Sequence, residues 1–74
     1  MPKYPVLKAS EIIRILNILG FYEVRQKGSH KQFKNDKGKS TTIPIHKNRD
    51  ISPILLKRIL KEIDVDLEIF SKHI

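Results

Sequence analysis

The chain has 74 residues, a formal net charge of +7 and no cysteine. A chain of this length forms one small core, so we expect a single domain over residues 1–74. The lack of cysteine excludes a disulfide framework, a thiolate nucleophile and a cysteine-ligated zinc site. No apolar run approaches the ~20 residues of a membrane span, and residues 1–7 lack the apolar stretch of a secretory signal, so we expect a cytoplasmic protein without a membrane partner.

The first predicted element is a helix, which follows an extended lead-in over residues 1–8 that contains two prolines. Apolar residues recur at helical spacing over residues 12–19, and Gly20 is the expected end of the helix. Ser10 is the expected N-cap, and Glu11 suits the positive end of a helix. The pattern therefore predicts an amphipathic helix with one buried face.

Three strands are predicted next, joined by short turns. Residues 21–26 are rich in aromatic and β-branched side chains and lead to a glycine that can form a hairpin turn, after which we expect a strand over residues 29–34. A polar turn cluster follows, and residues 39–45 then alternate apolar and polar side chains. Pro44 cannot donate a hydrogen bond to a ladder, so it belongs on an edge or at the end of its strand.

The last predicted elements are helical and follow a polar loop over residues 46–50. Ser52 and Pro53 suit the N-cap and the first position of a helix whose apolar face extends to Ile63. Asp66 is expected to cap a final short turn that packs an apolar side chain onto the core. The order predicts an α+β fold, a two-layer α-β-β-β-α sandwich with a three-stranded antiparallel sheet. The helices should cover one face of this sheet and leave the other open to solvent.

The net charge is concentrated in one part of the chain. Eight basic residues and a single acidic one lie from Arg25 to Arg49, whereas the other seven basic and seven acidic residues cancel. Such a cluster implies an acidic partner: nucleic acid leads, but a membrane surface or an acidic protein fits the same balance. His30 lies within this cluster, and strand alternation places it opposite Phe33, toward solvent or a ligand. Lys31 shares the side of Phe33, so either the helices do not reach it or the strand is bulged.

Histidine in a cationic cluster suggests chemistry on RNA. Metal-free cleavage needs a base for the ribose 2′-hydroxyl, cations for the transition state and a proton donor for the leaving oxygen. His30 could be that base or donor, or an ordinary surface histidine, and Gly28 and Ser29 could contact a phosphate or simply form a turn. His46 could contact phosphate or be a solvated loop residue. The candidate RNA-binding residues are Arg25, Lys27, Gly28, Ser29, Lys31, Lys34, His46, Lys47 and Arg49. No ligand spacing indicates a metal site, and no cofactor is expected.

Several motifs occur in one order along nearly the whole chain: Gly20-Phe21, Arg25-Gln26-Lys27-Gly28-Ser29-His30, Phe33, Ile43-Pro44-Ile45-His46 and Leu56-Lys57-Arg58-Ile59-Leu60-Lys61. Together they resemble the HicA, or YcfA-like, toxin family. The resemblance implies a fold similar to double-stranded-RNA-binding domains, ribosome-independent cleavage of mRNA, and silencing by a HicB-type antitoxin. It also implies that His30 is the catalytic histidine, with Arg25 to Ser29 and His46 beside it.

The chain departs from the family pattern at one pair of residues. Ile54-Leu55 stands where members commonly have Gly-Thr, which removes the support for a backbone or hydroxyl contact to RNA at the start of the last helix. Three hypotheses follow from the sequence. The first is a metal-independent endoribonuclease toxin that cleaves mRNA with His30, and the second is a noncatalytic RNA-binding module of the same fold. The third is a protein-interaction domain whose basic face meets an acidic partner.

Overall fold

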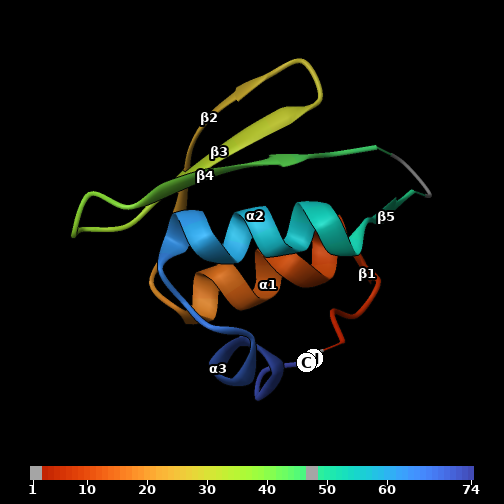
Figure 1. Cartoon of the computed structure of the whole chain (residues 1–74). Coiled ribbons are helices and arrows are strands. Elements are labelled where there is room, and N and C mark those ends of the chain that lie inside the picture. Colours follow the sequence, from red (N-terminus) through yellow and green to blue (C-terminus); the bar gives the residue numbers. More distant parts are fainter. Residues whose placement is uncertain (1–2, 47–48) are drawn as a thin grey trace.

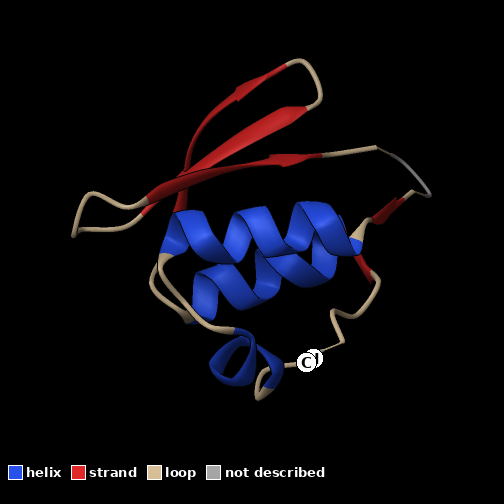
Figure 2. Ribbon diagram, in the orientation of Figure 1, coloured by secondary structure: helices blue, strands red, loops and turns tan. Residues whose placement is uncertain are grey.

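The computed structural model describes residues 3–46 and 49–74. The elements, in chain order, are β1 (Leu7–Lys8), α1 (Ala9–Ile18), β2 (Tyr22–Lys27), β3 (His30–Lys34), β4 (Ser40–Pro44), β5 (Asp50–Ile51), α2 (Pro53–Ile63) and α3 (Leu67–Ser71). Strands β2, β3 and β4 form an antiparallel sheet, and α1 and α2 cover one of its faces (Figures 1 and 2). The predicted order of helix, three antiparallel strands and helix is confirmed.

A second, two-stranded sheet was not expected from the sequence. β1 pairs antiparallel with β5, with Leu7 opposite Ile51 and Lys8 opposite Asp50. The prediction of a plain lead-in before the first helix and a plain loop before the second is therefore wrong at these positions. Strands of two residues are too short to show an alternating pattern. This two-stranded sheet, here called the β1–β5 ribbon, joins the segments that precede α1 and α2. Both helices start at this end of the molecule (Figure 1).

Helix α1 starts earlier than predicted and ends as predicted. It begins at Ala9, and Lys8 is its N-cap without a side-chain hydrogen bond, so the prediction that Ser10 caps it is wrong. The physical reason is that β1 leads directly into the helix. At the other end, Gly20 has a φ of 92°, and the amides of Gly20 and Phe21 donate back to carbonyls of the last turn. Glycine adopts this left-handed conformation without strain, and the chain turns toward β2.

The caps predicted for the two C-terminal helices are present. Ser52 Oγ accepts a hydrogen bond from the Leu55 amide at 3.1 Å, and Pro53 is the first residue of α2. Asp66 Oδ1 accepts from the Ile69 amide at 3.0 Å at the start of α3. Each cap satisfies an amide that has no partner within its own helix.

The core lies between the sheet and the helices and receives side chains from almost every element. The largest fully buried side chains are Phe33, Phe70, Ile12, Ile15, Leu16, Ile43, Leu56 and Ile59. Thr41 is buried as well, and its hydroxyl donates to Glu62 Oε1 at 2.7 Å, which links β4 to α2. Within residues 3–46 and 49–74, no helix combines the length and the apolar content needed to cross a bilayer.

The end of α2 contains a residue whose replacement should stabilise the fold. Asp64 has a φ of 59°, a left-handed conformation that glycine adopts more easily, and its carboxylate lies at the negative end of the helix. We expect Asp64→Gly to raise the free energy of unfolding by about 1 kcal/mol, measured by urea denaturation. Asp64→Asn removes the charge but keeps a side chain, so it should recover only the electrostatic part. A glycine variant no more stable than the asparagine variant would contradict the argument from backbone strain.

Candidate active site

The candidate site lies at the tip of the β2–β3 hairpin, which projects beyond the helix layer (Figure 1). The two strands are joined through Gly28 and Ser29, with Lys27 opposite His30. Gly28 has a φ of 58° and Ser29 has no positive φ, which is the pattern of a type II′ turn with glycine in its first central position. A Cβ atom at Gly28 would meet nothing within 4 Å, so the conformation of the turn rather than space requires glycine.

His30 lies on the open face of the sheet. Phe33, three residues further along β3, is buried against the helices at 1% exposure. His30 pairs in register with Lys27 of β2 and with Pro44 of β4, and its side chain is exposed. The predicted orientation of His30, away from the core, is confirmed.

His30 lines an open hollow of about 280 Å³, here called the His30 hollow. It is lined by Arg25, Lys27, His30, Gln32 and Thr42. These side chains come from all three strands of the sheet and share its open face. Among the described residues that line the hollow, none is acidic. Two cations together with an imidazole, an amide and a hydroxyl form a group suited to a phosphate.

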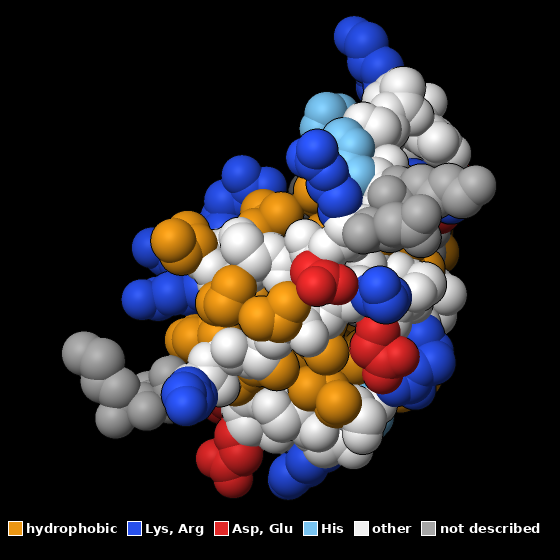
Figure 3. Space-filling model, turned by 90° about the vertical axis from the view of Figure 1, so that its right-hand side faces the viewer, with side chains coloured by type: hydrophobic (Ala, Val, Ile, Leu, Met, Phe, Trp, Pro, Cys, Tyr) orange, Lys and Arg blue, Asp and Glu red, His pale blue; other side chains and the backbone are white. Residues whose placement is uncertain are grey.

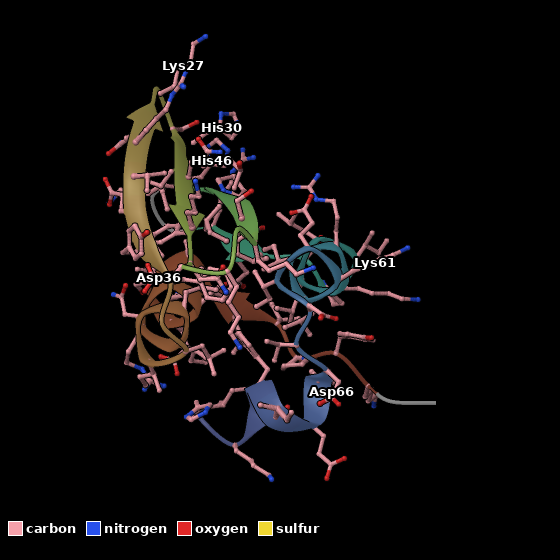
Figure 4. All side chains as sticks on the ribbon, turned by 90° about the vertical axis from the view of Figure 1, so that its left-hand side faces the viewer. Lys27, His30, Asp36, His46, Lys61 and Asp66 are labelled. Carbon is pink, nitrogen blue, oxygen red and sulfur yellow. The ribbon has the colours of Figure 1, made fainter. Side chains whose placement is uncertain are left out.

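His46 lies next to the His30 hollow. The ladder between β3 and β4 continues beyond Pro44, because the Ile45 amide donates to the Ser29 carbonyl. The residue after Ile45 is thereby carried along the hairpin turn, on the same face as Pro44. In Figure 4 the side chains of His30 and His46 lie close together near the hairpin tip, and both are exposed. The imidazole of His30, on β3, and that of His46, two residues after the end of β4, therefore lie at the same end of the open face.

Lys31 faces the other side of the sheet. Its Nζ lies 3.4 Å from Glu23 Oε1, and 29% of its side chain is exposed. The alternative that the strand of Lys31 itself is bulged is wrong, because β3 pairs with β4 in continuous register from His30 to Lys34. The register shift lies in the neighbouring strand, between Glu23 and Arg25 of β2. The salt bridge and the position of the hairpin beyond the helices allow a lysine on the face that carries Phe33. Lys31 is thus not brought together with His30.

The other predicted residues are spread over the surface. Lys34 shares the face of His30 but lies at the opposite end of β3. Arg49 is exposed, and its amide donates to the His46 carbonyl at 3.1 Å, which keeps the two residues near each other. Lys47 lies outside the described residues.

Sequence reasoning missed Thr42 and did not select Gln32. Gln32 is two positions from His30 in one strand, so alternation alone places it on the same face. Thr42 reaches the hollow because it pairs with Gln32 across β3 and β4, and no local pattern fixes that register.

The acidic residue within the basic cluster lies far from the hairpin tip. Asp36 is at the opposite end of the sheet from Lys27 and His30 (Figure 4). Asp36 Oδ1 accepts a hydrogen bond from the Tyr22 hydroxyl at 3.3 Å. Desolvation, and then this hydrogen bond, raise the pKa of Tyr22 above its ordinary value, so the phenol stays neutral. The positive charge at the tip is therefore not offset by Asp36. Among residues 3–46 and 49–74, no three histidine, aspartate or glutamate side chains are grouped as metal ligands.

A comparison with known protein families shows to which family the chain belongs. The family model described as "HicA toxin of bacterial toxin-antitoxin" matches residues 9–65. The chain belongs to the HicA toxin family. The resemblance seen in the sequence is confirmed, and the protein is the toxin of a toxin–antitoxin system, which implies an antitoxin partner. The HicA match extends from the first residue of α1 to just beyond α2. It includes the whole three-stranded sheet, His30 and His46, but not α3 or His73. A comparison with curated proteins gave no match.

Proposed function

We propose that this HicA toxin is an endoribonuclease that cleaves mRNA without a metal ion, with His30 as a general acid or base. The observation that carries the proposal is the exposed imidazole of His30 in a hollow that it shares with Arg25 and Lys27. An open sheet face gives a flexible single strand access to this group. Family membership supports the toxic role, and the chemistry of the hollow supports RNA as its target.

The groups around His30 match what the reaction needs. The ribose 2′-oxygen forms a bond to phosphorus while the bond from phosphorus to the 5′-oxygen breaks. One group takes the proton of the 2′-hydroxyl, and another gives a proton to the leaving 5′-oxygen. We assign these two tasks to His30 and the adjacent His46. Arg25 and Lys27 would offset the charge that develops on the phosphate.

A noncatalytic RNA-binding module is the second candidate, and the openness of the same face favours it. Both functions predict binding that weakens with salt, with log K falling by about 0.7 for each contacted phosphate per tenfold rise in salt. Only turnover distinguishes them.

Incubation of the purified protein with a defined transcript in EDTA tests the proposal. We expect complete cleavage in EDTA, followed by gel analysis and mapping of the RNA ends. A strict requirement for added Mg²⁺ would contradict the metal-free mechanism. Binding without any cleavage would support the RNA-binding module, and no affinity for RNA at low salt would support a protein-interaction domain.

We also propose that the antitoxin is of the HicB type and covers the face that carries His30. A basic patch attracts an acidic protein as readily as RNA, and one bound protein can block access to the whole hollow. In the same assay the antitoxin should therefore suppress cleavage. A complex that leaves His30 accessible and cleaves at the full rate would contradict this arrangement.

A further inference from the structure

A second hollow is lined by His46, and apart from this histidine the proposed mechanism uses none of its residues. Its volume is about 200 Å³, and it is formed by the end of β4, by β5 and by the start of α2. We call it the Asp50 hollow. Its lining includes the apolar side chains Pro44 and Leu55 and the polar side chains His46, Arg49, Asp50 and Ser52. Figure 3 views the side that carries β5 and the start of α2, where histidine and basic side chains lie above exposed hydrophobic ones.

The Asp50 hollow begins one strand away from His30. Pro44, which lines it, is the direct cross-strand partner of His30. Because the adjacent pair is joined by the bond from the Ile45 amide to the Ser29 carbonyl, His30 and Pro44 form a non-hydrogen-bonded pair, with Cα atoms about 4.5 Å apart. A phosphate held beside His30 therefore has a neighbouring nucleotide within reach of the Asp50 hollow.

The lining of the Asp50 hollow suits a nucleobase. Pro44 and Leu55 offer apolar surface to the flat face of a base, and the imidazole of His46 can stack on it. Arg49 supplies a charge for the phosphate that follows. At the rim, the Asp50 side chain is 55% exposed, and its Oδ1 lies 3.6 Å from Lys8 Nζ. This exposed contact involves one carboxylate oxygen, and the second can accept a hydrogen bond from a ligand.

We propose that the Asp50 hollow is a base-recognition subsite that prefers adenine, cytosine or guanine to uracil. The inference rests on the proposed function, because it assumes that RNA lies across His30. A carboxylate can only accept hydrogen bonds, and the three preferred bases each carry an exocyclic amino group that donates. Uracil has no amino group, and its one donor on its base-pairing edge, N3–H, lies between two carbonyl oxygens. A carboxylate that accepts from N3–H is therefore also repelled by a neighbouring carbonyl oxygen. The subsite thus selects the base next to the cleaved bond.

Binding of uncut RNA tests the subsite without relying on cleavage. The His30→Gln protein is mixed with short single-stranded RNAs that differ in the base at one position, and the affinities are measured by fluorescence anisotropy. At one position, uracil should weaken binding about tenfold. Asp50→Asn, added to this protein, should abolish the discrimination because its amide can donate to uracil. Asp36→Asn makes the same change of charge at the far end of the sheet and should preserve the discrimination.

Two results would overturn the subsite: equal affinity for all four bases at every position, or discrimination that persists unchanged in Asp50→Asn. Since Asp50 is exposed, the variant should keep its fold, which circular dichroism checks. The nuclease proposal and the subsite are tested by different measurements, so either can fail without the other. If uracil is discriminated against but the wild-type protein never cuts RNA, the subsite stands without the catalytic function. If RNA is cut and every base binds equally, only the subsite is lost.

Discussion

Replacing His30 with glutamine should lower the rate of RNA cleavage by about 10²- to 10⁴-fold while RNA affinity stays nearly unchanged. Glutamine keeps a polar side chain of similar size, but it cannot exchange a proton at neutral pH. The cations Arg25 and Lys27 remain in the hollow and continue to attract the phosphates. Because His30 is exposed, the stability of the protein should change by less than about 0.5 kcal/mol. Single-turnover cleavage and anisotropy on the same transcript measure the two quantities.

The chain offers matched controls for this experiment. His73 follows α3, and its backbone carbonyl, not its ring, accepts a hydrogen bond from Arg14, so His73→Gln should leave cleavage unchanged. His46→Gln tests the adjacent imidazole, and a loss as large as that of His30→Gln would indicate that the two histidines act as acid and base. Cleavage at the wild-type rate by a folded His30→Gln protein would remove His30 from the mechanism.

Replacing Phe70 with alanine should cost about 3–5 kcal/mol of unfolding free energy. Phe70 is fully buried, yet it belongs to α3, outside the segment 9–65 that the family model matches. The loss combines the transfer of a large apolar side chain to water with the cavity left behind. Small domains have total stabilities of about 0.05–0.15 kcal/mol per residue, so this single change should remove much of the stability. Urea denaturation of the variant and the wild type measures the difference.

The neighbouring residue provides the control for Phe70. Ile69 lies in the same short helix but is 46% exposed, so Ile69→Ala should cost less than about 1 kcal/mol. If the two alanine variants lost equal stability, α3 would not contribute to the core through Phe70. If Phe70→Ala is destabilised as expected, a segment beyond the family match is required for a stable toxin.

Some helix starts could be predicted from the sequence because they depend only on neighbouring residues. The start of α1 could not, because it depends on strand pairing with a distant segment. Ser52 before a proline and Asp66 before a short apolar run both cap their helices, because capping involves only the next few residues. Ser10 is an equally suitable residue, but β1 pairs with β5 and leads directly into α1, which therefore begins at Ala9. Pairing between residues more than 40 positions apart leaves no local trace in the sequence.

The candidate site also combines features that depend on neighbouring residues with features that depend on long-range strand pairing. The orientation of His30 follows from the alternation of side chains along one strand, which the sequence shows directly. The contributions of Thr42 and Pro44 depend on the register between β3 and β4, and that of Asp50 depends on the β1–β5 ribbon. A shift of one residue in that register would move Thr42 to the other face. The sequence therefore predicts the central residue of the site better than its surroundings.

Helices α1 and α2 start at the same end of the molecule, and their dipoles add to the positive electric field there. Peptide dipoles aligned along a helix leave about half a positive charge at its first turn. Glu11 offsets this charge in α1, whereas the first turn of α2, beside the Asp50 hollow, carries no acidic residue. Backbone groups as well as lysine and arginine side chains thus make this end of the toxin attractive to anions. The formal charge of +7 counts side chains only, so it does not include this contribution of the backbone to the attraction of a phosphate chain.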